Sequence, residues 1–247
     1  MMDDAIKQAI VTGAGGVLGG AVARLLARQG YRIVLVDVAT TALDSLAEEI
    51  GDEAYPLVLD ISDSKNVTAG CEKIRREVGD ISVLVNNAGI LSNNKAVETT
   101  AQEWRRVMAV NLNGAFYLSR EWLPAMKTRG WGRIVNVCSL AMKTGGLTAG
   151  TAYTSSKGAL ASLTFALARE WAPFGITVNG ISPAYIKTPM ITDFLSADQQ
   201  QQLLDQIPVG RFCEPEEVAH AVGFLVSPLS GFITGEIIDI NGGLHMD

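Results

Sequence analysis

The stretch "TGAGGVLGG", Thr12–Gly20, decides the fold because it joins two segments of different periodicity. Before it stands "AIVT" (9–12), which is short, apolar and rich in β-branched residues. After it, "LGGAVARLLARQG" (18–30) repeats its apolar residues with the 3.6-residue period of a helix. We therefore predict a strand, a glycine turn, and a helix that stops at Gly30.

Six further apolar runs follow, and most are apolar on consecutive rather than alternate positions. This pattern is typical of parallel strands that helices bury on both faces. Because the runs alternate with amphipathic stretches and no linker divides the chain, we predict a single domain over 1–247. Its fold class would be α/β, with a doubly wound parallel sheet flanked by helices. The runs are "RIVLVD" (32–37), "YPLVLD" (55–60), "ISVLVN" (81–86), "RIVNVC" (133–138), "ITVNGI" (176–181) and "EIIDI" (236–240).

Three stretches between the runs carry further signals. The stretch 63–79 begins with an Asp cap and ends in glycine, which predicts a helix. The stretch 100–130 predicts a long helix whose far end Pro124 bends or breaks. The polar, glutamine-rich excursion around 186–207 is expected to be a substrate lid. The alternative for this excursion is a surface helical insertion with no role.

Charge and cysteine content exclude several classes of partner. The 247 residues carry a formal net charge of −6 without a basic run, which argues against nucleic acid and anionic membranes. Three scattered cysteines and two distant histidines predict neither a disulfide framework nor a metal site. The N-terminal "MMDDAIKQAIV" is acidic, whereas a signal peptide is basic. We therefore expect a cytoplasmic protein with reduced thiols.

The glycines of the opening loop suit a phosphate site. A strand-to-helix junction presents free N–H groups, and small residues let a pyrophosphate approach them. Because many tight turns also use glycine, the loop alone is weak evidence. Asp37 strengthens it by ending the second strand, where an acidic group binds the adenosine ribose hydroxyls. Its charge repels a 2′-phosphate, and no arginine follows closely, so NAD is favoured over NADP.

Several separated motifs resemble the short-chain dehydrogenase/reductase family over nearly the whole chain. The loop resembles the family pattern T-G-x-x-x-G-x-G at Thr12, Gly13 and Gly19, whereas Val17 replaces the middle glycine. Further matches are "NNAG" (86–89), "VNLNG" (110–114), "YTSSK" (153–157) and "PAYIKT" (183–188). The resemblance implies a Rossmann-like fold that binds NAD. The loop and the resemblance together predict these cofactor contacts: Gly13, Gly15, Gly16, Leu18, Gly19, Asp37, Asp60, Ile61, Asn87, Ala88, Gly89, Tyr153, Lys157, Pro183, Ile186 and Thr188.

The resemblance also implies four catalytic residues: Asn111, Ser139, Tyr153 and Lys157. Moving a hydride between an alcohol carbon and nicotinamide requires a proton to leave or reach the oxygen. Tyr153 and Lys157 lie four residues apart on one helix face, where the ammonium favours the phenolate as acid or base. Ser139 would hydrogen-bond the substrate oxygen, and Asn111 would hold a water that relays the proton from Lys157. A lone Y-x-x-x-K pair is common on helix surfaces, but the four residues in family order favour catalysis.

Within the family, the sequence most resembles 3-oxoacyl-acyl-carrier-protein reductases and the sugar- and polyol-oxidising enzymes. A 3-oxoacyl or 3-hydroxyacyl thioester is one predicted substrate, and a sugar or polyol is the alternative. Arg129 matches one of two basic positions by which the reductases hold their acidic carrier protein. Pro173 and Phe174 occupy the region of the second position and offer no charge. Acyl carrier protein is therefore a weakly supported partner.

The resemblance also bears on the oligomeric state and on whether the protein is an enzyme or a sensor. The tail "INGGLHMD" (240–247) and the apolar long helix predict a homotetramer, or a homodimer. The segment 139–153 is one residue longer than in related enzymes, which would reshape the substrate pocket. A sensor that binds NAD without turnover is the other hypothesis. It is disfavoured because such proteins lose the tyrosine or the lysine, whereas both are present here.

Overall fold

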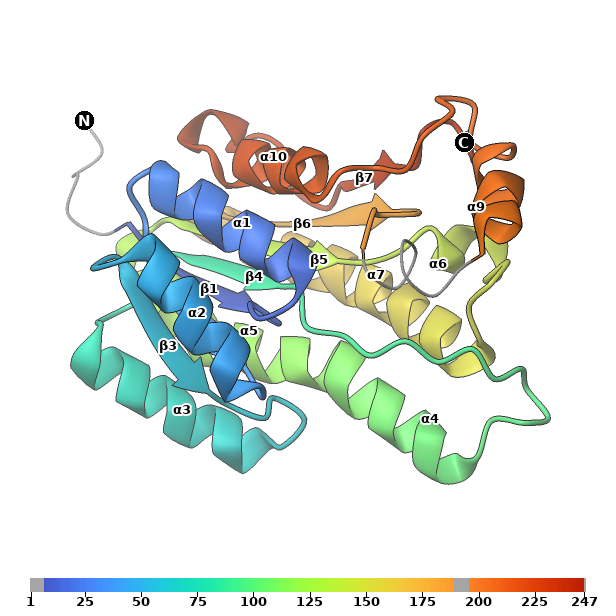
Figure 1. Cartoon of the computed structure of the whole chain (residues 1–247). Coiled ribbons are helices and arrows are strands. Elements are labelled where there is room, and N and C mark those ends of the chain that lie inside the picture. Colours follow the sequence, from blue (N-terminus) through green and yellow to red (C-terminus); the bar gives the residue numbers. More distant parts are fainter. Residues whose placement is uncertain (1–6, 189–195, 247) are drawn as a thin grey trace.

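A parallel sheet organises the chain. The computed structural model describes residues 7–188 and 196–246. Seven parallel strands lie in the order β3-β2-β1-β4-β5-β6-β7 (Figure 1). The predicted doubly wound sheet is therefore confirmed. The strands are β1 (Gln8–Thr12), β2 (Arg32–Asp37), β3 (Ala54–Val58), β4 (Val83–Asn86), β5 (Gly132–Val137), β6 (Ile176–Pro183) and β7 (Ile237–Ile240).

Helices cover both faces of this sheet (Figure 1). One face packs against α1 (Val17–Arg28), α2 (Thr40–Ile50) and α10 (Pro215–Val226). The other packs against α3 (Ser64–Glu77), α5 (Gly114–Arg129) and α7 (Thr151–Trp171). The other helical segments are α4 (Ala101–Met108), the π-helical η1 (Ala109–Asn113), α6 (Ala141–Thr144), η2 (Ala172–Phe174), α9 (Ala197–Leu204) and η3 (Pro228–Ser230).

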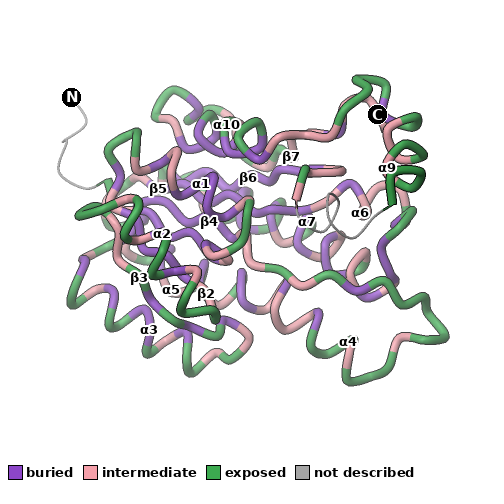
Figure 2. The backbone as a smooth tube through the Cα atoms, in the orientation of Figure 1, coloured by how far each residue is buried: buried purple, intermediate pink, exposed green. Residues whose placement is uncertain are grey.

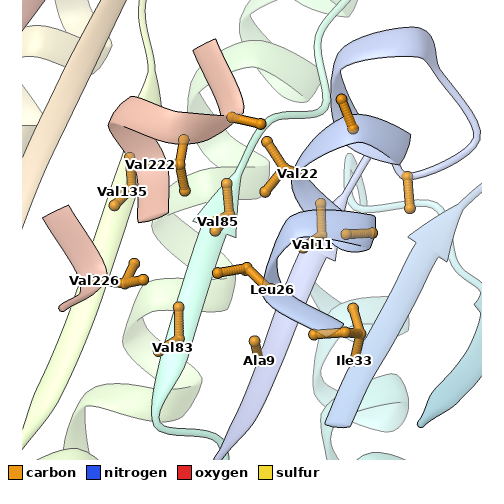
Figure 3. Close-up of a cluster of buried hydrophobic side chains, with 14 of the residues drawn as sticks. Ala9, Val11, Val22, Leu26, Ile33, Val83, Val85, Val135, Val222 and Val226 are labelled. Carbon is orange, nitrogen blue, oxygen red and sulfur yellow. The ribbon is translucent and has the colours of Figure 1, made fainter. Parts of the chain in front are cut away.

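Consecutive strand residues are buried on opposite faces of the sheet. Val11 packs with Val22 of α1 and Val222 of α10 (Figure 3). Its neighbour Ile10 belongs to the other core, where Trp122 of α5 is fully buried. The central strands β4, β5 and β6 are buried along their whole length (Figure 2). Burial on both sides explains why the strand sequences are apolar at successive positions.

The direction of strand progression reverses between β1 and β4. β1 pairs with β2 on one side and with β4 on the other. Crossover connections leave this pair in opposite directions, and open α/β sheets bind their ligands in a crevice at such a point, outside the carboxyl ends of the strands. The glycine loop follows β1, and the segment Asn86–Gly89 follows from the end of β4. Two motifs that are distant in sequence therefore meet at this edge.

Pro124 does not break the long helix, so that part of its prediction is wrong. The proline lies inside α5, which continues to Arg129 and ends where Gly130 adopts a φ of 70°. Proline removes a hydrogen bond to the carbonyl four residues earlier, here that of Arg120. Because Arg120 and Pro124 are both exposed, water can satisfy that carbonyl. The irregularity in the long helix occurs earlier, in the π-helical segment η1.

The packing of α1 on the sheet predicts a large effect of Leu26→Ala. Leu26 is fully buried, so removing its side chain should lower the free energy of unfolding by about 3 kcal/mol. Urea unfolding monitored by circular dichroism measures this change. Leu147, which is 62% exposed, provides the matched control. Leu147→Ala should change stability by no more than about 0.5 kcal/mol, and equal effects at both positions would contradict this core.

Candidate active site

The glycine loop is shaped by contacts that exclude side chains. Gly13 has a φ of 65°, and a Cβ there would lie 2.9 Å from the Ala88 Cα. A Cβ on Gly19 would collide with the Gly13 carbonyl oxygen. The first turn of α1 has Gly16 as its N-cap and no side-chain cap. The loop therefore leaves backbone N–H groups at the crevice for an anionic ligand.

Asp37 is the last residue of β2 and lies against this loop. Its Oδ2 accepts a hydrogen bond from the Gly15 N–H at 3.0 Å, and its Oδ1 accepts one from the Val38 N–H at 2.7 Å. A Cβ on Gly15 would come within 3.1 Å of the same carboxylate. The carboxylate therefore has a fixed place at the end of β2, beside the loop that would hold the phosphates.

The two loop residues that depart from a plain glycine pattern have different environments. Val17 is the first residue of α1, and its side chain is 41% exposed. It thus occupies the surface of the loop and takes no part in the core. Leu18 is partly buried and packs against the core cluster beneath α1. Only the main chain of Leu18 is therefore available to a ligand at the loop.

Thr12 joins the glycine loop to the segment after β4. Its Oγ1 accepts hydrogen bonds from the N–H groups of Asn87 and Ala88, each at 3.0 Å. The Asn87 amide Nδ2 donates to the Thr12 and Gly13 carbonyls at 2.8 and 3.2 Å. Sequence reasoning used Thr12 only to match the loop pattern and missed this bridging role. Its position at the end of a buried strand, before the turn, was the available signal.

Two further predicted cofactor residues, Asp60 and Ile61, lie on the loop that follows β3. Asp60 is exposed, and its Oδ1 accepts from the Ser62 N–H at 2.9 Å. The Ile61 side chain packs so closely on α5 that a Cβ at Gly114 would lie 2.6 Å from it. A cofactor contact at Ile61 would therefore have to involve its backbone.

The "PAYIKT" segment continues from the end of β6. The Pro183 carbonyl accepts from the Leu140 N–H at 3.1 Å, and Ile186 forms an isolated parallel bridge with Cys213. Thr188 is the last described residue before the gap at 189–195. The predicted lid is therefore described only at 186–188 and 196–207, where α9 begins with a capping box of Ser196 and Gln199. Its central part lies outside the described residues.

Lys157, the one cationic residue among the four predicted catalytic residues, is buried. Its side chain is 3% exposed, and its Nζ donates to the Val137 carbonyl at 2.7 Å. The Nζ lies 5.7 Å from the centre of the Tyr153 ring. A Cβ on Gly89 would lie 3.4 Å from both Lys157 Nζ and Asn111 Oδ1. The structure therefore brings together two predicted catalytic residues and the predicted cofactor segment.

An ammonium group has three hydrogen-bond donors. Within residues 7–188 and 196–246, Lys157 uses one of them, on Val137, and forms no ion pair. Burying a cation with unused donors is costly unless a partner binds them. The hydroxyl groups of a nicotinamide ribose have the required chemistry. The donor set therefore fits the predicted cofactor.

Asn111 is held in place by its side-chain amide. It is 1% exposed and lies in the π-helical segment η1. Its Oδ1 accepts from the Ile90 N–H at 2.8 Å, and its Nδ2 donates to the Ile90 carbonyl at 3.1 Å and to Ser156 Oγ at 3.0 Å. The Ser156 hydroxyl donates in turn to the Tyr153 carbonyl at 2.7 Å. Both amide hydrogens are used, so the predicted water would have to donate to an oxygen of Asn111.

Ser139 lies two residues beyond β5, where the chain turns into α6. Its Oγ accepts from the Ala141 N–H at 3.2 Å, which leaves its own hydrogen to donate. Its neighbour Cys138 is buried, and this burial raises the pKa of the thiol to about 11. The thiol beside Ser139 is therefore protonated at neutral pH and is a poor nucleophile.

Two further charged groups bear on the substrate predictions. Lys143, one helical turn after Ser139, forms a 2.7 Å ion pair with Asp239 of β7. Arg129 donates to the Ile81 carbonyl at 3.3 Å. Ile81 precedes β4, so Arg129 lies at the amino edge of the sheet, opposite the crevice. This position separates Arg129 from the predicted catalytic residues.

In the described part of the chain, no group of three or more His, Cys, Asp or Glu side chains is placed to hold a metal ion. None of the helices in those residues has the length and apolar character needed to span a membrane.

Comparisons with known proteins identify the family of the chain. A family model described as enoyl-(acyl carrier protein) reductase matches residues 13–245. The 3-oxoacyl-[acyl-carrier-protein] reductase of Vibrio cholerae is 36% identical, over 97% of this chain and 98% of its own length. The galactitol 2-dehydrogenase (L-tagatose-forming) of Cereibacter sphaeroides is 40% identical, over 95% and 93%. A putative gluconate dehydrogenase structure from Agrobacterium tumefaciens has a TM-score of 0.91 at 31% identity, covering 96% and 95% of the two chains. The chain belongs to the short-chain dehydrogenase/reductase family of oxidoreductases.

Proposed function

We propose that the protein is an NAD(H)-dependent oxidoreductase that interconverts a secondary alcohol and a ketone. The observation that carries this proposal is the buried Lys157 ammonium with unused donors, next to Asn111 and Gly89 at the crevice. A merely structural lysine at 3% exposure would be expected to pair with a carboxylate. The whole chain would act as one cytoplasmic oxidoreductase domain.

The chain's own residues would manage the proton while the bound nicotinamide supplies or accepts the hydride. Tyr153 would take the proton from an alcohol, or return it to a ketone, as the acid and base of the reaction. Lys157 would favour its phenolate and bind the ribose hydroxyls. The Ser139 hydroxyl would donate to the substrate oxygen and stabilise the charge that develops there.

Asp37 supports NAD as the cofactor. Three backbone N–H groups, those of Gly15, Val38 and Ala39, donate to its carboxylate. These contacts hold a negative charge beside the loop where the adenosine ribose would bind. A 2′-phosphate at this place would meet that charge, so NADP should bind more weakly than NAD.

Two substrate classes have support. The relatedness to 3-oxoacyl-[acyl-carrier-protein] reductases supports an acyl thioester, and the relatedness to a galactitol dehydrogenase supports a polyol or sugar. Lys143 lies four residues after Ser139 and pairs with Asp239 at 2.7 Å. A charged pair in the turn after the proposed substrate-binding serine would suit a polyol or sugar better than an acyl chain. Segment 186–207 would act as the lid over this substrate. The protein would assemble as a homotetramer or a homodimer, as the family resemblance implies.

The role of Tyr153 predicts the effect of Tyr153→Phe. This change removes only the hydroxyl, so turnover should fall by about 10²- to 10⁴-fold. NADH binding, measured by its fluorescence, should change little because Lys157 and the loop remain. A variant with normal turnover would refute this assignment. Normal NADH binding by a wild-type protein that turns over no ketone, thioester or polyol would instead favour the sensor.

The charge of Asp37 predicts a change of cofactor preference in Asp37→Asn. Asparagine keeps one of the two acceptor oxygens but removes the charge that would oppose a 2′-phosphate. The ratio of the NADPH to the NADH dissociation constant should therefore fall by about tenfold, the equivalent of about 1.4 kcal/mol. Asp60→Asn, at an exposed acid on the next strand end, is the control and should leave the ratio unchanged. Equal affinity of the wild-type protein for both cofactors would contradict the argument.

The Lys143–Asp239 pair predicts the preferred substrate class. With NAD or NADH, kcat/KM should be higher for polyols and their ketoses than for 3-hydroxyacyl or 3-oxoacyl thioesters. A spectrophotometric panel at 340 nm provides the measurement, using both reaction directions. The opposite order would assign the protein to the thioester class and leave the role of Tyr153 intact.

A further inference from the structure

The helix that carries Tyr153 begins without a side-chain cap of its own. Its N-cap is Gly150. The N–H groups of Gly150 and Thr151 donate instead to the main-chain oxygens of Ser92 and Asn94, at 2.7 and 3.1 Å. A Cβ on Gly150 would collide with the Asn94 backbone, so the two stretches of main chain are in direct contact. A remote segment therefore caps α7.

One carboxylate holds both of these capping residues. Glu103 of α4 accepts a hydrogen bond from Ser92 Oγ at 2.5 Å through one oxygen. Its other oxygen accepts from Asn94 Nδ2 at 2.8 Å. These two donors hold the pKa of Glu103 below its ordinary value, so the group is an ionised acceptor at neutral pH. Because Ser92 is buried, its hydroxyl depends on this partner.

The same segment is fixed at both of its ends. At one end, the Asn111 side-chain amide forms two hydrogen bonds with the main chain of Ile90. At the other end, Lys95 Nζ donates to the carbonyls of Ala149 and Gly146 at 2.7 and 3.2 Å. Glu103 binds the part in between, which contacts the first turn of α7. The segment 90–95 therefore links the π-helical turn of the long helix to the start of the Tyr153 helix.

We propose that Glu103 is a positioning residue for Tyr153. By fixing Ser92 and Asn94, its carboxylate fixes the first turn of α7, and with it the place of the phenol relative to Ser139 and the crevice. Glu103 itself touches neither the reacting atoms nor the cofactor loop. The inference rests on the proposed function, since it assigns a role in catalysis by Tyr153.

Glu103→Ala and Glu103→Gln test this role. Loss of the carboxylate in Glu103→Ala should lower kcat by about 10- to 100-fold, because small misplacements of reacting groups have large effects. The NADH dissociation constant should stay within about twofold, because the glycine loop and Asp37 are untouched. In Glu103→Gln, the amide oxygen can accept from Asn94 while its N–H donates to a rotated Ser92 hydroxyl. This variant should therefore restore most of kcat. Gln102→Ala, at the exposed neighbour on α4, is the control for the helix.

Further variants keep the test decisive if Glu103→Ala folds poorly. Asn94→Ala removes one donor and leaves the carboxylate, and it should lower kcat in the same way. The kcat of the double variant Asn94→Ala/Glu103→Gln should be no lower than that of Asn94→Ala alone, because both changes act on the same Asn94–Glu103 hydrogen bond. Wild-type kcat in Glu103→Ala and Asn94→Ala would overturn the proposal. So would a parallel loss of NADH binding, which indicates general damage. If Tyr153→Phe is inactive in the same assay, such a result leaves the proposed function standing.

Discussion

The contact between the glycine loop and the end of β4 is the constraint on which the site depends. The Thr12 hydroxyl oxygen accepts hydrogen bonds from the N–H groups of Asn87 and Ala88, and Gly13 lies in close contact with the same segment. A side chain at Gly13 or Gly19 would separate the two strand ends. The contact brings the loop N–H groups that would bind phosphates close to the segment that ends at Gly89. Lys157 approaches Gly89 from α7, so the groups proposed to bind the cofactor and to move the proton lie at the same edge of the sheet.

Much of this arrangement could be predicted from local sequence, because buried parallel strands have a distinct pattern. All seven strands follow from consecutive apolar residues, and the Asp37 position follows from the length of the first strand–helix–strand unit. The break predicted at Pro124 does not occur, because Arg120 and Pro124 lie on the exposed side of α5, which the presence of proline alone does not reveal. The π-helical turn at Asn111 was missed for a similar reason, since one inserted residue hardly alters an apolar stripe.

The Glu103 network was beyond sequence reasoning for a different reason. Its hydrogen bonds run from a helix to a loop, and from that loop's main chain to a second helix. Every residue has a main-chain carbonyl that can accept a hydrogen bond, so no sequence motif marks Ser92 and Asn94 as the residues that cap α7. The proposed catalytic residues were easier to name because family motifs mark their side chains in the sequence. Residues that position them through the backbone become visible only when the contacts are known.

Asp37 shows why cofactor selection and loop structure are coupled in this fold. The carboxylate that would face the adenosine ribose also accepts hydrogen bonds from Gly15, Val38 and Ala39. The same two oxygens thus serve the loop and would serve the proposed choice of cofactor. A small neutral residue would remove the negative charge and also the acceptor that fixes the Gly15 N–H. A substitution at this position that is meant to alter cofactor preference must therefore keep an acceptor for the loop, because the loop would otherwise lose a contact that shapes it.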